Sequence, residues 1–217
     1  MFKIKGTYAY IVALFLNAFT DLGHKIIIQN TIFKMYDNQE QIILTAIVNA
    51  LILLPFIMVF TPAGFLSDKF PKNKVMVYAA VLAVILTLGI TASYYMGMFK
   101  VAFAFTFLLA MQSAIYSPAK YGYIKELVGN KFISAGNAAV QAATTVAILS
   151  GIVVSTVLFE NILTTYETAD DILREIAPLG WLLVAGSLLE LYFMATLPHH
   201  QRVPSERKFH LKHNISG

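Results

Sequence analysis

Four long stretches of this sequence carry no ionisable side chain, which is the pattern of membrane-spanning segments. Residues 41–67, 75–99, 101–119 and 132–159 contain no Asp, Glu, Lys or Arg. A bilayer core is about 30 Å thick, and a helix needs about 20 apolar residues to cross it. Backbone polar groups find no water in lipid, so such segments must be helical. With 13% of its residues charged, the chain lacks the polar surface of a soluble domain. We therefore expect an all-α membrane protein.

The hydropathy pattern predicts six transmembrane helices. Their expected ranges are 7–33, 41–67, 74–95, 98–118, 132–159 and 178–198. We expect residues 1–198 to form one bundle, in which two groups of three helices suit an inverted 3+3 repeat. Residues 199–217 are polar and basic, and are expected to be a tail or the start of a central loop. The acidic loop near 160–177 is expected to contain a short amphipathic helix.

Basic residues are unevenly divided between the two sides that six spans define. One side has only Lys34, Lys100 and Arg174. The other side has twelve basic residues: Lys3, Lys5, Lys69, Lys72, Lys74, Lys120, Lys125, Lys131, Arg202, Arg207, Lys208 and Lys212. Because Lys and Arg concentrate in cytoplasmic loops, both termini are expected in the cytoplasm. Topology thus accounts for the net charge of +4, and no nucleic-acid partner is expected.

Polar side chains recur along one face of the first predicted helix. Asn17, Asp21 and Lys25 are four residues apart, which places them on one side of a helix. Ionisable groups are costly to bury in lipid, so these should face a cavity or a partner. Two interpretations stay open, a functional site or a structural ion pair within the helix. We expect His24 to be a hydrogen-bonded interior histidine, and Glu190 to meet a cation or a wet cavity.

A short turn with Gly, Asp and Lys separates the second and third predicted helices. Residues 64–74 read Gly-Phe-Leu-Ser-Asp-Lys-Phe-Pro-Lys-Asn-Lys. This resembles the major facilitator superfamily loop Gly-x-Leu-x-Asp-Arg-x-Gly-Arg-Lys/Arg, with proline for the second glycine and lysines for the arginines. We expect the glycine to let a neighbouring helix approach closely. The alternative is an ordinary turn with cytoplasmic charges. The resemblance implies a conformational latch formed by Gly64, Asp68, Lys69 and Lys72.

Residues 117–122, Ser-Pro-Ala-Lys-Tyr-Gly, follow the fourth predicted helix. Pro118 removes a backbone donor, so it should end or kink that helix and leave Lys120 in a basic loop at headgroup level. With Glu126 and Leu127, the segment resembles lysophospholipid transporters, a branch of the same superfamily. The resemblance implies that Lys120 contacts a lipid phosphate. The alternative is an interfacial lysine that extends toward water.

The same resemblance extends to the first and fifth predicted helices. Family members often have Asn-Asp-Asn-x-x-Lys in the first helix, and Asp21 and Lys25 fall on its Asp and Lys, without the flanking asparagines. This implies that Asp21 binds a headgroup or pairs with a second half of the transporter. In the fifth helix, Asn137 and Gln141 share a face and either line a cavity or bond a neighbouring helix. The candidate substrate-binding residues are Asn17, Asp21, Lys25, Lys120, Asn137 and Gln141.

Catalytic motifs are not found in the sequence. Relatives are sometimes fused to a glycerophospholipid acyltransferase with a His-x-x-x-x-Asp motif, and none of the five histidines has Asp at that spacing. With no phosphate loop, cysteine or metal-ligand cluster, we expect neither an enzyme nor a cofactor.

The resemblance implies half of a bacterial inner-membrane transporter that moves lysophospholipid toward the cytoplasmic leaflet. Its expected partners are lysophospholipid, membrane lipids, a C-terminal six-helix half or a second copy, and a fused or associated acyltransferase. Two alternatives stay open. One is a small-solute transporter of the same fold, and the other is a membrane anchor for a fused enzyme.

Overall fold

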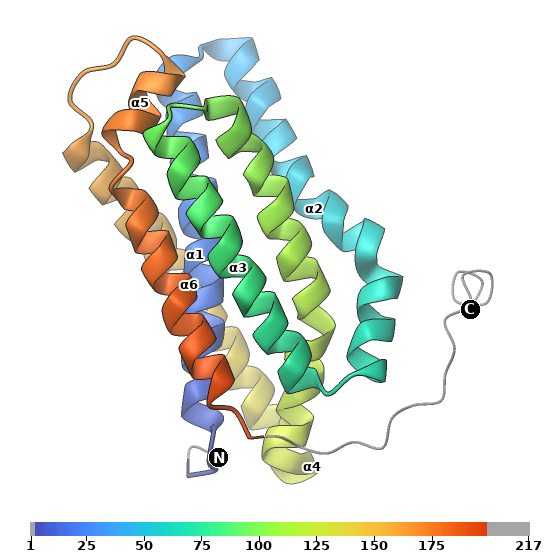
Figure 1. The fold of residues 1–217 in the computed structure, drawn as a ribbon. Coiled ribbons are helices and arrows are strands. Elements are labelled where there is room, and N and C mark those ends of the chain that lie inside the picture. The colour runs from blue at the N-terminus through green and yellow to red at the C-terminus, as the bar shows by residue number, and fades with distance from the viewer. Residues whose placement is uncertain (1–2, 199–217) are drawn as a thin grey trace.

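The computed structural model describes residues 3–198, and over this range every regular element is a helix (Figure 1). The elements are α1 (Thr7–Met35), α2 (Asn38–Lys69), α3 (Lys72–Tyr95), α4 (Phe99–Ile162), α5 (Ala169–Glu175) and α6 (Leu179–Ala195). Of these, four are long and apolar enough to cross a membrane, and the bent pair of α5 and α6 gives a fifth candidate. Five of the six predicted helical segments coincide with observed helical segments to within a few residues, and the fourth, predicted to end at 118, continues to Gly129. The tail predicted for 199–217, with its four basic residues, lies outside the described range.

The helix α4 is too long to be a single membrane crossing. At about 1.5 Å per residue, a straight helix of this length would be about three bilayer cores long. The chain reverses at Gly129, whose φ of 69° and ψ of 174° are non-helical. This combination is essentially restricted to glycine. Figure 1 shows the two arms of α4 running in opposite directions from this point.

The helix end expected at Pro118 is wrong. The chain stays helical through 113–122 and onward to Gly129, so no basic loop follows the proline. Proline removes one backbone hydrogen bond, and membrane helices tolerate this where neighbouring groups satisfy the freed carbonyl. Lys120 consequently lies within the helix rather than in a loop. Only 8% of its surface is exposed.

The start of α1 and the end of α6 lie at the same end of the bundle (Figure 1). Tyr123 of α4 ties this end together, since its hydroxyl donates a 2.9 Å hydrogen bond to the carbonyl of Pro198. The α2–α3 turn and the reversal of α4 lie at this end as well. We call it the basic end, because it gathers Lys3, Lys5, Lys69, Lys72, Lys74, Lys125 and Lys131.

Buried apolar side chains form two separate clusters. One includes Ile28 of α1, Ile90 of α3 and Leu183 of α6. The other lies toward the basic end and includes Leu14 and Met76. Between the clusters, α1, α4 and α6 contribute a set of polar side chains, which we call the polar layer: Asn17, Thr20, Asp21, Gln112, Ser113, Ser187 and Glu190.

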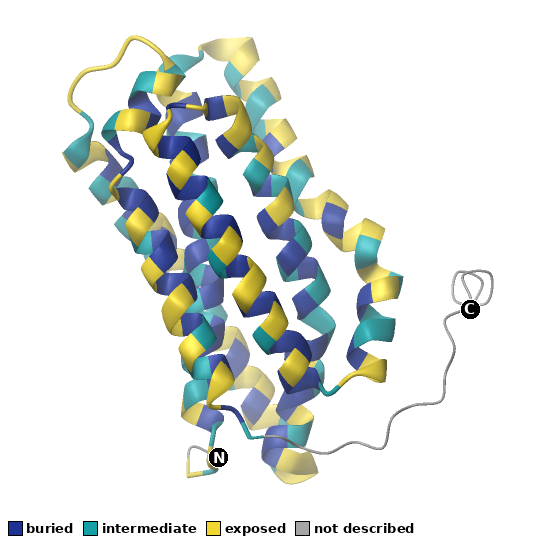
Figure 2. Ribbon diagram, viewed as in Figure 1, coloured by how far each residue is buried: buried dark blue, intermediate teal, exposed yellow. Residues whose placement is uncertain are grey.

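The helix α2 differs from the others because most of its surface is exposed, as Figure 2 shows. It contains two prolines, Pro55 and Pro62, within the helix. Each removes one backbone hydrogen bond. At the basic end, a short turn joins α2 to α3 (Figure 1).

The short helix expected in the acidic loop is confirmed as α5. Thr168 caps it, because its side chain accepts from the Asp171 amide while the Asp171 carboxylate accepts from the Thr168 amide. Ile172 and Leu173 are fully buried, whereas Asp170 and Arg174 are exposed. The helix is therefore amphipathic, and its apolar side anchors the loop to the bundle.

Replacing Gly129 with alanine should destabilise the chain by about 1–3 kcal/mol, because the backbone there is strained for any residue with a Cβ. Gly64 is the matched control. At both positions an added Cβ would have nothing within 4 Å, but Gly64 is helical. Gly64→Ala should therefore stabilise by roughly 0.5–1 kcal/mol. Unfolding in detergent, followed by circular dichroism, measures both. Equal stabilities of the two variants would contradict the assignment of strain to Gly129.

Candidate functional site

A cavity of about 250 Å³ lies beside the polar layer. Its polar lining comes from α1 and α4, with Asp21, Lys25 and Ser113 among the contributing residues. Its apolar lining includes Ile52 and Phe56 of α2. The cavity thus combines an acid and an amine with a hydrocarbon wall. The remaining lining residues are Leu22, His24, Thr106, Leu109 and Ala110.

Asp21 is held by a contact between helices rather than within its own helix. The hydroxyl of Ser113 on α4 donates a hydrogen bond to the Asp21 carboxylate. Within the described range, no ion pair joins Asp21 to Lys25, so the intrahelical pair considered from the sequence is not observed. Four residues apart on α1, both side chains instead contribute to the cavity wall.

A second carboxylate lies close to this site. Glu190 of α6 is fully buried, and it interacts electrostatically with Asp21 and Lys120. Neither of its oxygens has a hydrogen-bond partner of good geometry among the described residues, although Asn17 interacts with the carboxylate. Two acids and one ammonium therefore share a low-dielectric interior, where each charge depends strongly on the others.

Lys120 approaches the polar layer from the basic end. It lies seven residues, or about two helical turns, beyond Ser113 on the same face of α4. Its backbone carbonyl accepts a 2.5 Å hydrogen bond from the hydroxyl of Tyr10. Its ammonium lies 5.4 Å from the ring centroid of Tyr121 and interacts electrostatically with Asp21. Lys120 does not line the cavity in the described part of the chain, but its charge acts on the same carboxylates.

The other predicted binding residues lie in two different places, one in the buried polar layer and two on the surface. Asn17 is buried in the polar layer, and within residues 3–198 its amide nitrogen makes no hydrogen bond of good geometry, although it faces the Glu190 carboxylate. Asn137 and Gln141 are exposed on the second arm of α4, so the structure does not bring them to the cavity. Sequence reasoning missed Ser113. Its signal was a Gln112–Ser113 pair in an otherwise apolar run.

His24 is the interior histidine expected from the sequence. Its Nε2 lies 3.1 Å from the carbonyl oxygen of Ala102 and its Nδ1 lies 2.7 Å from the hydroxyl of Tyr94. Because a carbonyl only accepts, Nε2 carries the proton and Nδ1 accepts from Tyr94. The imidazole is therefore fully satisfied in its neutral form, and its role is to join α1, α3 and α4.

The four predicted latch residues lie in different surroundings. Gly64 has no atom within 4 Å of where a Cβ would stand, so the close helix approach expected there is wrong. Asp68 and Lys69 are exposed, and the Lys69 ammonium lies 5.4 Å from the ring centroid of Phe65. Lys72 is the buried member.

Lys72 forms a buried ion pair with Glu126 of α4. Its Nζ lies 2.8 Å from Oε1, and the two side chains are only 5% and 11% exposed. The lysine stem packs directly on Gly122, where a Cβ would clash with it. The close approach in this region is therefore at Gly122, between α3 and α4, and the pair fixes the beginning of α3 against α4.

Removing one partner of this pair should destabilise the chain. Lys72→Met or Glu126→Gln alone should cost about 3–5 kcal/mol, because the remaining charge stays buried without its partner. The double variant should recover most of that loss. The control is Lys34–Glu160, whose side chains are 32% and 49% exposed. Lys34→Met should change stability by less than about 1 kcal/mol. Unfolding in detergent compares the four proteins, and additive losses in the double variant would argue against a coupled pair.

Comparison with known proteins gives one consistent family. The family model of the Major Facilitator Superfamily matches residues 8–212. The lysophospholipid transporter LplT of Escherichia coli is 39% identical over 160 residues, which cover 71% of this chain and 36% of the relative. LplT of Enterobacter sp. is 34% identical over 203 residues, or 89% of this chain and 44% of the relative.

A third relative, LplT of Photorhabdus laumondii, is 33% identical over 153 residues, or 69% of this chain and 35% of the relative. The chain thus spans less than half the length of these relatives. The family match covers the described helices from residue 8 onward, and four of them, or five spans with the bent pair α5–α6, are long and apolar enough to cross a membrane. The chain therefore belongs to the Major Facilitator Superfamily, as a multi-pass membrane protein similar to lysophospholipid transporters.

Proposed function

We propose that the chain is one six-span half of a lysophospholipid transporter in a bacterial inner membrane. Counting the two arms of α4 separately, and α5 with α6 as one bent span, gives six crossings. Six crossings form two groups of three, which supports the inverted-repeat arrangement. The basic end, where α1 begins and α6 ends, would be cytoplasmic by the positive-inside rule.

The observation that carries this proposal is the mixed lining of the cavity beside the polar layer. Asp21 and Lys25 provide opposite charges, while Ile52, Phe56 and Leu109 provide an apolar wall. A lysophospholipid with an ethanolamine headgroup carries an ammonium, a phosphate and one acyl chain. We assign the Asp21 carboxylate to the ammonium and the Lys25 amine to the phosphate, while Lys120, outside the cavity lining, acts on the site through its charge. The apolar wall favours such a lipid over a small polar solute.

Transport would require a second six-helix unit, from a longer chain or a second copy. An exposed apolar face on α2 supports this, since Leu53, Ile57 and Phe60 are 64%, 76% and 76% exposed. Rocking of two units around a central site would move the lipid toward the cytoplasmic leaflet. There an acyltransferase, fused or associated, would re-acylate it. The exposed Asn137 and Gln141 would then lie toward the second unit. The Lys72–Glu126 pair would stabilise one of the two conformations between which the units rock.

Neutralising the proposed headgroup site should reduce uptake of labelled lysophosphatidylethanolamine. Asp21→Asn and Lys120→Gln should each lower the uptake rate at least about tenfold, because each removes one partner from a buried charge set. Vesicles from cells that express the gene at its natural locus provide the assay. Glu167→Gln and Lys125→Gln, which neutralise exposed residues, are the matched controls. Uptake that stays unchanged in both site variants would defeat the assignment.

A further inference from the structure

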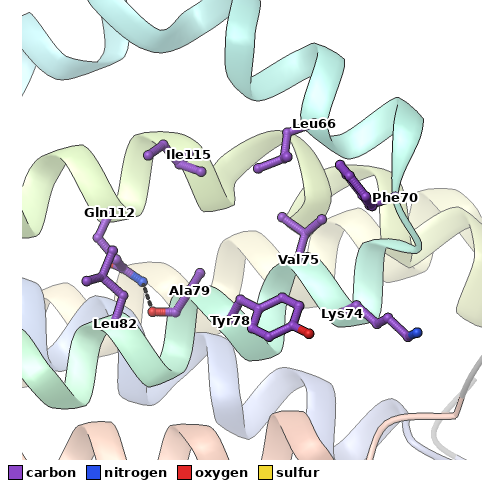
Figure 3. A pocket seen from close by; sticks show the side chains of 9 residues that line it. All are labelled: Leu66, Phe70, Lys74, Val75, Tyr78, Ala79, Leu82, Gln112 and Ile115. Atoms are coloured by element: carbon purple, nitrogen blue, oxygen red, sulfur yellow. Dashed lines mark hydrogen bonds between the residues drawn. The ribbon is translucent and has the colours of Figure 1, made fainter. Parts of the chain in front are cut away.

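A second cavity, larger than the one that Asp21 lines, lies outside the proposed headgroup site. It has a volume of about 490 Å³ and is formed where α2, α3 and α4 meet near the basic end. Its walls are apolar, with Leu66 from α2, Val75 and Leu82 from α3, and Ile115 from α4 (Figure 3). We call it the lateral groove. None of its lining residues lines the cavity that contains Asp21.

The lateral groove is apolar along its length and polar at one end. Lys74, Tyr78 and Leu82 follow one another at four-residue spacing on one face of α3. At 1.5 Å per residue, Lys74 and Leu82 are about 12 Å apart along the helix. Figure 3 shows the Lys74 ammonium and the Tyr78 hydroxyl toward the same end. Gln112 does not add a free polar group, because its amide donates a 2.9 Å hydrogen bond to the carbonyl of Ala79.

The polar end of the groove carries a positive charge that can bind an anionic group. Lys74 is exposed, and its ammonium has no ion-pair or hydrogen-bond partner among residues 3–198. Of its neighbours, Lys72 is neutralised by Glu126, and Lys69 lies over the rings of Phe65 and Phe70. The exposed Asp68 is the one acid in segment 68–74, against three lysines. Lys74 also stands near the start of the candidate span Lys72–Tyr95, where headgroups would lie.

We propose that the lateral groove binds an anionic phospholipid of the surrounding membrane, with its phosphate at Lys74 and Tyr78. One acyl chain follows α3 past Val75 toward Leu82. A cation at headgroup level attracts anionic lipid, while the acyl chain packs against the apolar wall through van der Waals contact. The polar end of the groove matches a phospholipid headgroup, and its apolar wall matches an acyl chain. A soluble anion would contact only the polar end. The site is separate from the transported substrate, so it stands whether or not the transport proposal holds.

Lipid retention by the purified 217-residue chain tests this proposal. The chain is reconstituted with phosphatidylglycerol or with phosphatidylcholine, transferred to mild detergent, and its bound lipids are counted by native mass spectrometry. The chain should retain phosphatidylglycerol in preference. Lys74→Gln should retain about fivefold less of it. Leu82→Trp should displace the acyl chain and lower retention of both lipids. Lys125→Gln, another exposed lysine at the basic end, is the control and should retain as much as the unmodified chain.

Three outcomes would overturn the proposal. Equal retention by the chain, Lys74→Gln and Leu82→Trp would show that the groove holds no lipid. A loss in Leu82→Trp alone would show that the occupant is an apolar chain without an anionic headgroup. Equal losses in Lys74→Gln and Lys125→Gln would show a general effect of charge. Helical circular dichroism of each variant checks folding, and Lys74→Gln, an exposed substitution, decides the question even where Leu82→Trp misfolds.

Discussion

Ionisable side chains in the interior of a membrane bundle must be satisfied by their neighbours, and this requirement organises the molecule. Asp21, Lys120 and Glu190 come from three different helices and act on one another electrostatically. An isolated charge of this kind would be expensive in hydrocarbon. The polar layer they occupy separates the two apolar clusters, and the mixed cavity lies beside it. The position of the candidate site thus follows from where the bundle tolerates charge.

The sequence predicted the helices well because bilayer thickness imposes their length. The charge-free runs matched observed helices, and the acidic loop contained the short helix that its composition indicated. His24 was correctly predicted as an interior residue, since a histidine beside buried helix faces usually finds hydrogen-bond partners. Asp21 and Lys25 line one cavity, as their spacing on a single helical face suggested. Periodicity is enough for contacts of this kind because they depend on one helix alone.

The sequence was less informative where the outcome depends on which helices meet. Pro118 indicated a helix end, but the chain remained helical and turned at Gly129 instead. The hydropathy pattern around Gly129 did not identify this residue as the turning point. The partner of Lys72 is Glu126, 54 residues away, and no local spacing reports such a pairing. Gly64 matched a family pattern, yet the tight helix contact lies at Gly122. Glu190 could be recognised as a buried acid, but its proximity to Asp21 and Lys120 follows only from tertiary packing.

The two prolines of α2 have a mechanical consequence. Pro55 and Pro62 are seven residues apart, which is close to two full turns, so they lie on nearly the same side of the helix. Each removes a hydrogen bond from that side, and the resulting bends add rather than cancel. Two bends with this spacing therefore lie in nearly one plane, while the end of α2 stays tied to α3 by the short turn after Lys69. Flexing of α2 in this plane would change the distance between the middle of α2 and its neighbours, while the backbone hydrogen bonds on the side of α2 opposite the prolines stay intact.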